Sequence, residues 1–362
     1  MRRRDFMAAG GAALTAGLAG CSSLSGGSSG GDVTHTVSME PVGEVGLTGV
    51  PETVATYFPS YAEMAVALGH GDAVASVGVK SRYHTDVYDE LDGVSLDKSA
   101  LTPLWDGGID TEVFHNIDAD LHLIDPNWLT NNFKGIAQSD VESLTDRVAP
   151  FLGNTIFRRT DDWHDYRYYT LYEAFEKVAK VFQEQDRYDE FATFHDETVS
   201  AVQDSLPEER PSAALVFEYS DEPTDFSPSR ISDGGTNKKQ FRDLGVMDAF
   251  EGTDIEGIST SQRATIGYES LLDVDPDVLL IRGHEGKTRE EFVNGPVAFM
   301  KNHDVASQLT AVENDDVYRG GPVYGGPIQH LFLLERFGSL LFPDAVSEPV
   351  FDRAELASII TG

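Results

Sequence analysis

Apolar and polar residues follow one another in a pattern that predicts a strand, a helix and a second strand near the start of the folded chain. Residues 54–58 (VATYF) are apolar, β-branched and aromatic, which is typical of a buried strand. Ser60 and Glu63 match a capping box for a helix over residues 61–68, which carries a helical apolar pattern, and residues 74–79 predict the next strand. This order indicates a parallel sheet, and ligands bind such sheets beyond the carboxyl ends of the strands.

A helix followed by a strand occurs twice, with the same spacing of apolar and acidic residues. Residues 109–124 (IDTEVFHNIDADLHLI) align without gaps to residues 266–281 (IGYESLLDVDPDVLLI). Most apolar positions agree, and three acidic pairs match, namely Glu112 with Glu269, Asp118 with Asp275, and Asp120 with Asp277. A repeat of this length indicates two similar α/β lobes.

One long helix is predicted between the two repeats. Residues 170–183 are strongly amphipathic, and residues 187–206 carry a second helical pattern that Pro207 ends. A helix of this length would join two lobes rigidly. We therefore predict an α/β protein with mainly parallel central sheets, in which the helix over residues 187–206 connects an N-terminal lobe (51–186) to a C-terminal lobe (207–362).

The first 21 residues have the features of an export signal. Arginines at positions 2–4 precede an apolar run, 8–19, which is too short to span a membrane as a helix. The run leads into LAGC, which resembles a lipobox, so Cys21 is the expected site of lipid attachment; a secretory peptide with an incidental cysteine is the alternative. Residues 22–50 are rich in serine and glycine, which predicts a flexible tether. We expect export by the twin-arginine route and a lipid anchor at the extracellular face of the cell membrane.

Charge limits the environment and the partners of the protein. The 362 residues include 27 Lys and Arg against 61 Asp and Glu, and the net charge of −34 is spread along the whole chain. Such an acidic surface suits high salt, where self-repulsion is screened, so we expect a halophilic source such as a halophilic archaeon. No basic stripe is present to meet phosphates, which argues against nucleic acid as a partner. Cys21 is the only cysteine, so a disulfide framework is excluded.

Four segments together resemble the substrate-binding lipoproteins of ABC importers that carry iron–siderophore complexes, haem and vitamin B12. They are PETVATYFPSYAEMAVALGHGDAVASVGV at residues 51–79, IDTEVFHNIDADLHLI at 109–124, YESLLDVDPDVLLI at 268–281 and ENDDVYRGG at 313–321. The resemblance covers residues 50–344 and implies two Rossmann-like lobes joined by a long rigid helix. The chain departs from the family pattern at Ala119, where a proline is usual, and in its acidic surface.

The resemblance also implies a function and partners. The implied function is capture of an iron(III)-siderophore-type chelate outside the cytoplasm and its delivery to a membrane permease with its ATPase, by a monomer that has no cofactor of its own. Glu112 and Glu269 match the two glutamates that dock onto permease arginines in this family, and an ordinary exposed helical glutamate is the alternative for each. Cobalamin, haem and free metal are alternative ligands. A surface sensor or an extracytoplasmic enzyme is an alternative function.

Candidate ligand-binding residues follow the predicted strands of both lobes, where the cleft is expected. Aromatic side chains offer rigid apolar faces, and arginine offers charge-assisted hydrogen bonds to an anionic complex. A siderophore supplies all the iron ligands, so the protein would need no cluster of His or carboxylate ligands. The candidates are Tyr57, Tyr83, His84, Trp105, Trp128, Arg158, Tyr219, Arg230, Arg282, His284 and Tyr324.

Other interpretations of these residues stay open from the sequence. The aromatic residues are equally compatible with a core position, Tyr57 in particular. His84 and His284 could ligate a metal or haem directly, although the sequence shows no tight set of carboxylate neighbours for either. The segment Gly69-His70-Gly71 lacks the third glycine of a dinucleotide fingerprint, and neither a P-loop nor a G-x-S-x-G motif occurs, which disfavours the enzyme alternative.

Overall fold

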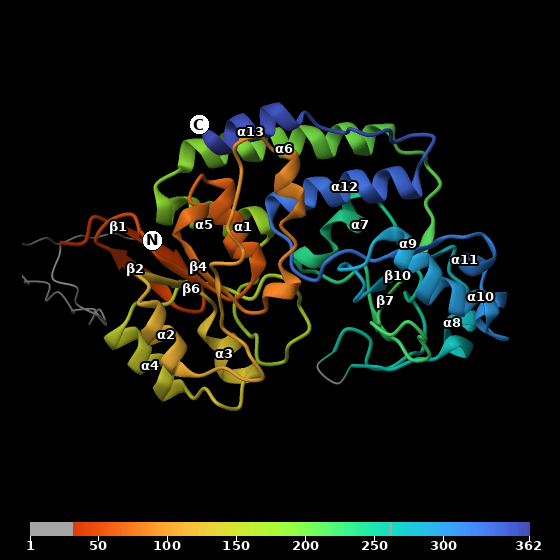
Figure 1. Ribbon diagram of the computed structural model, residues 1–362, viewed down its shortest axis with the longest axis horizontal. Helices are drawn as coiled ribbons and strands as arrows, with labels where there is room; N and C mark the ends of the chain where they lie inside the picture. The colour runs from red at the N-terminus through yellow and green to blue at the C-terminus, as the bar shows by residue number, and fades with distance from the viewer. Residues whose placement is uncertain (1–31, 261–262) are drawn as a thin grey trace, which may run out of the picture.

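The computed structural model describes residues 32–260 and 263–362, which form two α/β lobes (Figure 1). The predicted signal, with Cys21, lies outside the described residues. In the N-terminal lobe, a four-stranded parallel sheet has the order β5-β4-β3-β6. Its strands are β3 (Val54–Thr56), β4 (Val74–Val77), β5 (Thr102–Pro103) and β6 (Leu121–Leu123). The helices of this lobe are α1 (Pro59–Ala67), α2 (Thr111–Ile117), α3 (Pro126–Asn132), α4 (Gln138–Arg147) and α5 (Leu171–Phe182).

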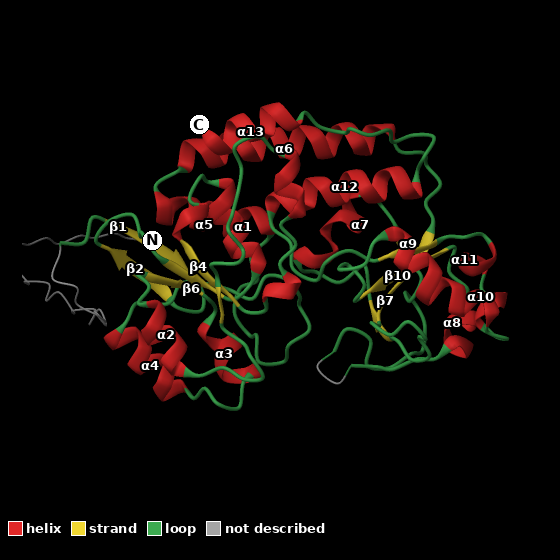
Figure 2. Ribbon diagram, in the orientation of Figure 1, coloured by secondary structure: helices red, strands yellow, loops and turns green. Residues whose placement is uncertain are grey.

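The C-terminal lobe has a second, mainly parallel sheet with helices around it (Figure 2). Its central strand β7 pairs in parallel with β10 and β9 and antiparallel with β8, and β11 extends the sheet beyond β10 in parallel. The strands are β7 (Ser212–Phe217), β8 (Ser227–Ser229), β9 (Met247–Asp248), β10 (Val278–Arg282) and β11 (Val317–Arg319). The helices are α7 (Lys239–Asp243), α8 (Tyr268–Val274), α9 (Arg289–Phe292), α10 (Ala298–Asn302) and α11 (Thr310–Glu313). The predicted fold class is confirmed.

Long helices connect the lobes. The predicted linker (187–206) coincides with α6 (Gln185–Ser205), and α12 (Pro327–Leu341) runs beside it (Figure 1). After α12 the chain returns to the first lobe, because α13 (Arg353–Thr361) packs against α6 and contributes to the core of the N-terminal lobe. The predicted assignment of residues 207–362 to the C-terminal lobe is therefore wrong for α13.

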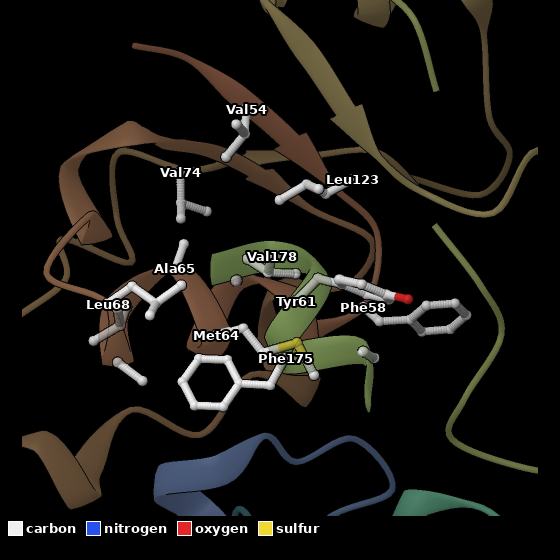
Figure 3. Close-up of a cluster of buried hydrophobic side chains, with 14 of the residues drawn as sticks. Val54, Phe58, Tyr61, Met64, Ala65, Leu68, Val74, Leu123, Phe175 and Val178 are labelled. Carbon is white, nitrogen blue, oxygen red and sulfur yellow. The ribbon is translucent and has the colours of Figure 1, made fainter. Parts of the chain in front are cut away.

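The helix that follows β3 is buried on every side. All nine residues of α1 are buried, which agrees with the apolar pattern of the predicted helix. Figure 3 shows Val54 and Val74 of the sheet on one side of the helix, and Phe175 of α5 close to Met64 on the other. The helix also contacts α12. A helix in this position links the sheet of one lobe to a helix that extends into the other.

The capping box predicted at the start of α1 is wrong. Helix α1 begins at Pro59, and no side chain caps it. The hydroxyl of Ser60 is buried and has no hydrogen-bond partner in the described part of the chain. The Oε1 of Glu63 instead accepts the backbone N–H of Gln329 at 2.7 Å. The carboxyl group therefore caps α12, because the first turn of α12 packs against α1.

The tether predicted over 22–50 is wrong in its second half. In this segment β1 (His35–Met39) pairs antiparallel with β2 (Gly43–Leu47), and β1 packs against α5. Alternate residues of the hairpin point into the core of the N-terminal lobe. They are Val37, Met39, Val45 and Leu47. This alternation is a strand signal that the nearby serine and glycine content obscured.

The internal repeat is confirmed in structure as α2–β6 and α8–β10. Asp118 and Asp275 end their helices in the left-handed conformation, with φ of 52° and 41°. Asp120 and Asp277 each accept a backbone N–H at or just before the start of the neighbouring strand, β3 or β7, at 2.9 and 2.8 Å. The matched acids thus have the same roles in both lobes. Asp118 and Asp275 end the helix, and Asp120 and Asp277 connect the strand that follows it to the neighbouring strand of the sheet.

Candidate functional site

Five aromatic side chains pack together where the carboxyl end of the N-terminal sheet meets the loop after β11. This aromatic cluster consists of Tyr57, Phe58, Trp128, Phe157 and Tyr324. Phe58 lies at its centre, with ring centroids 4.9 Å from Trp128 and 5.3 Å from Tyr324. Phe157 completes the set at 5.0 Å from both Phe58 and Tyr324. The cluster therefore joins segments from opposite ends of the chain at the strand edge where a ligand is expected.

A buried aspartate holds one side of the aromatic cluster in place. Asp125 follows β6 and caps α3, accepting the Asn127 N–H at 3.0 Å, which orients the helix that carries Trp128. Its Oδ2 also accepts the hydroxyls of Thr155 and Tyr166 at 2.8 and 2.6 Å. The loop that contains Phe157 is thus fixed against α3. Asp125 was not predicted from the sequence, although an acid directly after a buried strand was the available signal.

A second acid fixes the loop that carries Tyr324. Glu285 accepts the Gly321 N–H at 2.9 Å and the Nη1–H of Arg336 at 2.8 Å. The arginine lowers the pKa of Glu285 against the effect of burial, which acts to raise it. Gly321 has φ of 81°, which favours glycine, so this turn depends on its residue type. Glu285 was also missed from the sequence, because its partners lie far away along the chain.

Cationic groups flank the aromatic cluster. The Arg158 guanidinium lies 5.1 Å from the ring centroids of both Trp128 and Phe157, and its Nε donates to Asp161 at 2.7 Å. The Nη1 of Arg82 lies 3.4 Å from the Tyr324 hydroxyl. Burial raises the pKa of Tyr57, so its phenol is neutral near pH 7. The site is therefore an aromatic surface with cations at its edge.

Four of the predicted ligand-binding residues lie together at this site. They are Tyr57, Trp128, Arg158 and Tyr324. The three aromatic residues among them are only 6–8% exposed, so they pack as part of a core as well as lining the strand edge. The core position that the sequence left open for Tyr57 is confirmed, and its contact with a ligand stays a prediction.

Two other candidates are core residues. Tyr83 is 1% exposed, and its hydroxyl lies 2.9 Å from that of Tyr88. His284 is buried beside the ring of Phe292, with centroids 5.3 Å apart, and burial lowers its pKa. Because both side chains are enclosed by protein, this placement argues against direct contact with a ligand.

Two predicted arginines stabilise the C-terminal lobe. The Arg230 guanidinium donates to the carbonyl oxygen of Phe250 at 2.5 Å. Arg282 is buried and donates from Nε to the Gly320 carbonyl at 3.2 Å and from Nη2 to the Asn237 carbonyl. Burial lowers the pKa of Arg282 to about 10. Backbone carbonyls, rather than an anionic ligand, are the partners of both side chains.

The remaining candidates lie outside the aromatic cluster. Trp105 and Tyr219 are 42% and 74% exposed. His84 lines a separate cavity of about 380 Å³ together with Asp86, Asp89 and Lys98, and burial lowers its pKa. No group of three or more His, Cys, Asp or Glu side chains suited to a metal ion occurs within residues 32–260 and 263–362.

The two predicted docking glutamates occupy equivalent positions. Glu112 and Glu269 are exposed, each in the first turn of its helix, α2 or α8. This equivalence follows from the internal repeat, which places one carboxylate on each lobe.

Comparison with known protein families identifies the fold. The profile of a family described as "Periplasmic binding protein" matches residues 54–324, which spans both lobes and the aromatic cluster. The chain belongs to this periplasmic binding protein family. Membership makes it a binding protein rather than an enzyme, which removes the enzyme alternative.

Relatives of this periplasmic binding protein include one with a curated name. The Fe(3+)-citrate-binding protein YfmC of Bacillus subtilis (strain 168) is 22% identical over 276 residues, which are 76% of this chain and 75% of that protein.

Solved structures show the same fold at low sequence identity. The iron uptake ABC transporter substrate-binding protein PiuA from Streptococcus pneumoniae has a TM-score of 0.62 at 15% identity, covering 86% of this chain and 100% of that one. The petrobactin-binding protein YclQ from Bacillus subtilis has a TM-score of 0.58 at 15% identity, covering 85% and 98%. The heme binding protein HmuT has a TM-score of 0.59 at 14% identity, covering 87% and 92%.

No helix among the described residues has both the length and the apolar composition required to cross a bilayer.

Proposed function

We propose that this periplasmic binding protein captures an iron(III) chelate at the aromatic cluster and delivers it to the permease and ATPase of an ABC importer. The observation that carries the proposal is the cluster itself, which joins aromatic rings after β3 and β6 to Tyr324 of the loop after β11. The names of the relatives support the ligand class, because YfmC binds Fe(3+)-citrate, YclQ binds petrobactin and PiuA serves iron uptake.

The chemistry of the cluster suits a chelate whose organic part encloses the iron. Such a complex presents flat or apolar surfaces to aromatic rings and negative charge to cations. Tyr57, Trp128 and Tyr324 supply the rings, and Arg82 and Arg158 supply the cations. The chelator provides all the ligands of the iron, so the protein contributes contact surface and orientation.

Tryptophan fluorescence tests this ligand assignment. In high salt, ferric citrate or a ferric hydroxamate should quench Trp128 fluorescence, because the bound iron lies within the reach of its ring. The Trp128→Phe variant should lose most of the quenching, and the matched Trp105→Phe variant, at an exposed position, should keep it. Haem, cobalamin and uncomplexed iron form the comparison series. Quenching by uncomplexed iron alone would refute the proposal.

A truncation measures the contribution of one ring. We expect Tyr324→Ala to weaken binding of the ferric chelate about tenfold, because it removes one aromatic contact surface. Tyr219→Ala, outside the cluster and 74% exposed, serves as the control and should bind normally. Equal affinities for both variants in a calorimetric titration would show that the cluster does not bind the chelate.

Delivery is proposed to use Glu112 and Glu269. Two rim carboxylates on separate lobes would set the register of docking onto permease arginines without deep burial. Charge reversal at both, Glu112→Lys with Glu269→Lys, should abolish uptake of the iron chelate by cells while the purified protein still binds it. Reversal of Glu290 and Glu355, also exposed on helices, is the matched control. Undiminished uptake by the Glu112/Glu269 variant would rule out this docking mode.

The proposed location follows from the segment before the described residues. We propose that twin-arginine export and lipidation at Cys21 anchor the protein at the extracellular face of the cell membrane. The Cys21→Ala variant should then be released into the medium with its ligand affinity unchanged. Retention of this variant in the membrane fraction would contradict lipid anchoring.

A further inference from the structure

A cavity of about 350 Å³ lies between the lobes and shares no residue with the aromatic cluster. On the N-terminal side its wall is formed by Arg159 and residues 169–172, and on the C-terminal side by residues 234–236 and part of α7. Tyr172 of this wall lies against His195 of α6, with ring centroids 4.6 Å apart. The cavity is therefore on the side of the linker helix.

The lining of the cavity is basic in a protein that is otherwise strongly acidic. Three basic side chains, Arg159, Lys239 and Arg242, face one acidic side chain, Asp243. Lys239 pairs with Asp243 at 2.6 Å. Arg242 donates to the carbonyl oxygens of the loop over residues 233–235 at 2.9 and 2.7 Å, which orients its guanidinium without neutralising its charge. The cavity thus keeps a positive excess while the whole chain has a net charge of −34.

Arg159 is the most accessible of these cations. Its guanidinium lies 5.1 Å from the ring centroid of Tyr168, a stacking contact that directs the side chain without occupying its donors. The side chain also passes close to Gly234 on the opposite wall, where an added Cβ would lie 2.3 Å from its Cδ. Arg159 therefore extends from the first lobe to the wall that the second lobe provides.

Two buried hydroxyls on the wall lack partners. Thr236 is 8% exposed, and its Oγ1 has no hydrogen-bond partner among the described residues. The buried phenol oxygen of Tyr172 has none there either. A buried hydroxyl without a partner is destabilising, and a bound water or ion is one way in which such a group is satisfied.

We propose that this cavity is a second binding site, which takes a small oxyanion with two or more negative charges, such as a polycarboxylate or phosphate. Arg159, Lys239 and Arg242 would form charge-assisted hydrogen bonds to its oxygens, and the hydroxyls of Thr236 and Tyr172 would complete its coordination. Because the walls belong to both lobes, the bound anion links them. The site is independent of the aromatic cluster and of its ligand.

Thermal unfolding of the full-length protein in metal-free citrate or phosphate, at an ionic strength held constant with sodium chloride, tests the site. We expect one of the two anions to stabilise the protein saturably, beyond the effect of chloride, and the comparison identifies which. The Arg159→Gln variant should bind that anion about tenfold more weakly, because it removes a charge-assisted hydrogen bond. The control Arg289→Gln, at an exposed position in α9, should keep the wild-type affinity. No saturable effect, or equal affinities of the two variants, would overturn the proposal.

Thr236→Val provides a second test that is insensitive to loss of fold. Without anion, this variant should unfold at the same temperature as the wild type or higher, because it removes an unsatisfied hydroxyl. Its anion affinity should fall. Unchanged affinity in Thr236→Val would overturn the proposal. Titration of both variants with the ferric chelate separates the two sites, since anion binding should be weakened while chelate binding is unchanged.

Discussion

Glu63 is a buried carboxyl group whose hydrogen-bond partners are backbone N–H groups of α12. Its Oε1 accepts the Gln329 N–H at 2.7 Å, and its side chain is almost completely enclosed. Burial raises its pKa from 4.5 to about 8, although the backbone hydrogen bonds act in the opposite direction. Tyr57 lies just before α1, and Tyr324 lies just before α12. The contact of Glu63 with α12 therefore fixes the positions of these two tyrosines relative to each other.

The raised pKa of Glu63 gives stability a defined dependence on pH. A carboxyl group that keeps its proton in the folded state, and loses it when unfolded, stabilises the fold less and less as pH rises from about 4.5 to about 8. Glu63→Gln keeps the acceptor and removes the titration. We expect its free energy of unfolding at pH 8 to exceed that of the wild type by a few kcal/mol, on the order of 1.4 per pKa unit.

Denaturant titrations of Glu63→Gln at pH 5 and pH 8 check this expectation. The exposed Glu290→Gln is the control and should follow the wild type at both values. A Glu63→Gln protein that is less stable than the wild type at pH 8 would show that the carboxylate is ionised and held by the first turn of α12.

At the scale of elements, α13 packs with the N-terminal lobe although it follows the C-terminal lobe in the sequence. The helix packs against α6, and Leu356 lies fully buried in the core of the N-terminal lobe. The guanidinium of Arg187 in α6 donates to the carbonyl oxygen of Ile360, which ties the two helices together. Helix α13 therefore stabilises the first lobe and the linker, whereas Phe342 and Val346, just after α12, still pack in the core of the C-terminal lobe.

Truncation of one α13 side chain tests this assignment. We expect Leu356→Ala to cost about 2–5 kcal/mol of stability, as for other large-to-small changes in a core. Ser358→Ala, exposed on the same helix, should be neutral within about 0.5 kcal/mol. In Leu356→Ala, the exchange rate of backbone amide hydrogens should rise first in α6 and α1. Faster exchange confined to β7 and β10 would place α13 with the other lobe.

At the scale of the whole molecule, charge is the dominant property. The net charge of −34 makes self-repulsion a large unfavourable contribution to the compact state at low ionic strength. The screening length falls from about 10 Å at 0.1 M to about 3 Å at 1 M salt. Added salt should therefore stabilise the fold strongly.

Unfolding in increasing potassium chloride measures this effect. We expect the unfolding temperature to rise continuously between about 0.01 and 1 M salt, as the screening length falls from about 30 Å to about 3 Å. Sucrose at matched osmolality is the control, because it favours compact states without screening charge. An unfolding temperature that responds to both solutes equally would show that self-repulsion is a minor term.

Local chemistry was sufficient to predict much of the fold. The strand before Pro59, the linker helix and the repeated helix–strand unit are encoded by short-range apolar periodicity and by helix-ending residues such as Asp118 and Asp275. Three residues of the aromatic cluster, among them Tyr57 and Tyr324, and the flanking Arg158 were named together as candidates, because each lies at or beyond the end of a predicted strand. The elements depend on neighbours within a few residues, whereas the contact between the two ends of the chain in the cluster does not.

Packing between distant segments decided the rest. The carboxyl of Glu63 caps a helix that begins more than 250 residues later, Asp125 holds a loop, and Arg282 binds carbonyl groups rather than a ligand. Residue type and local spacing are the same for a buried Tyr83 as for a ligand-binding tyrosine. Which buried polar group finds which partner is set by three-dimensional proximity and by the cost of leaving such a group unsatisfied, and neither is visible in local sequence.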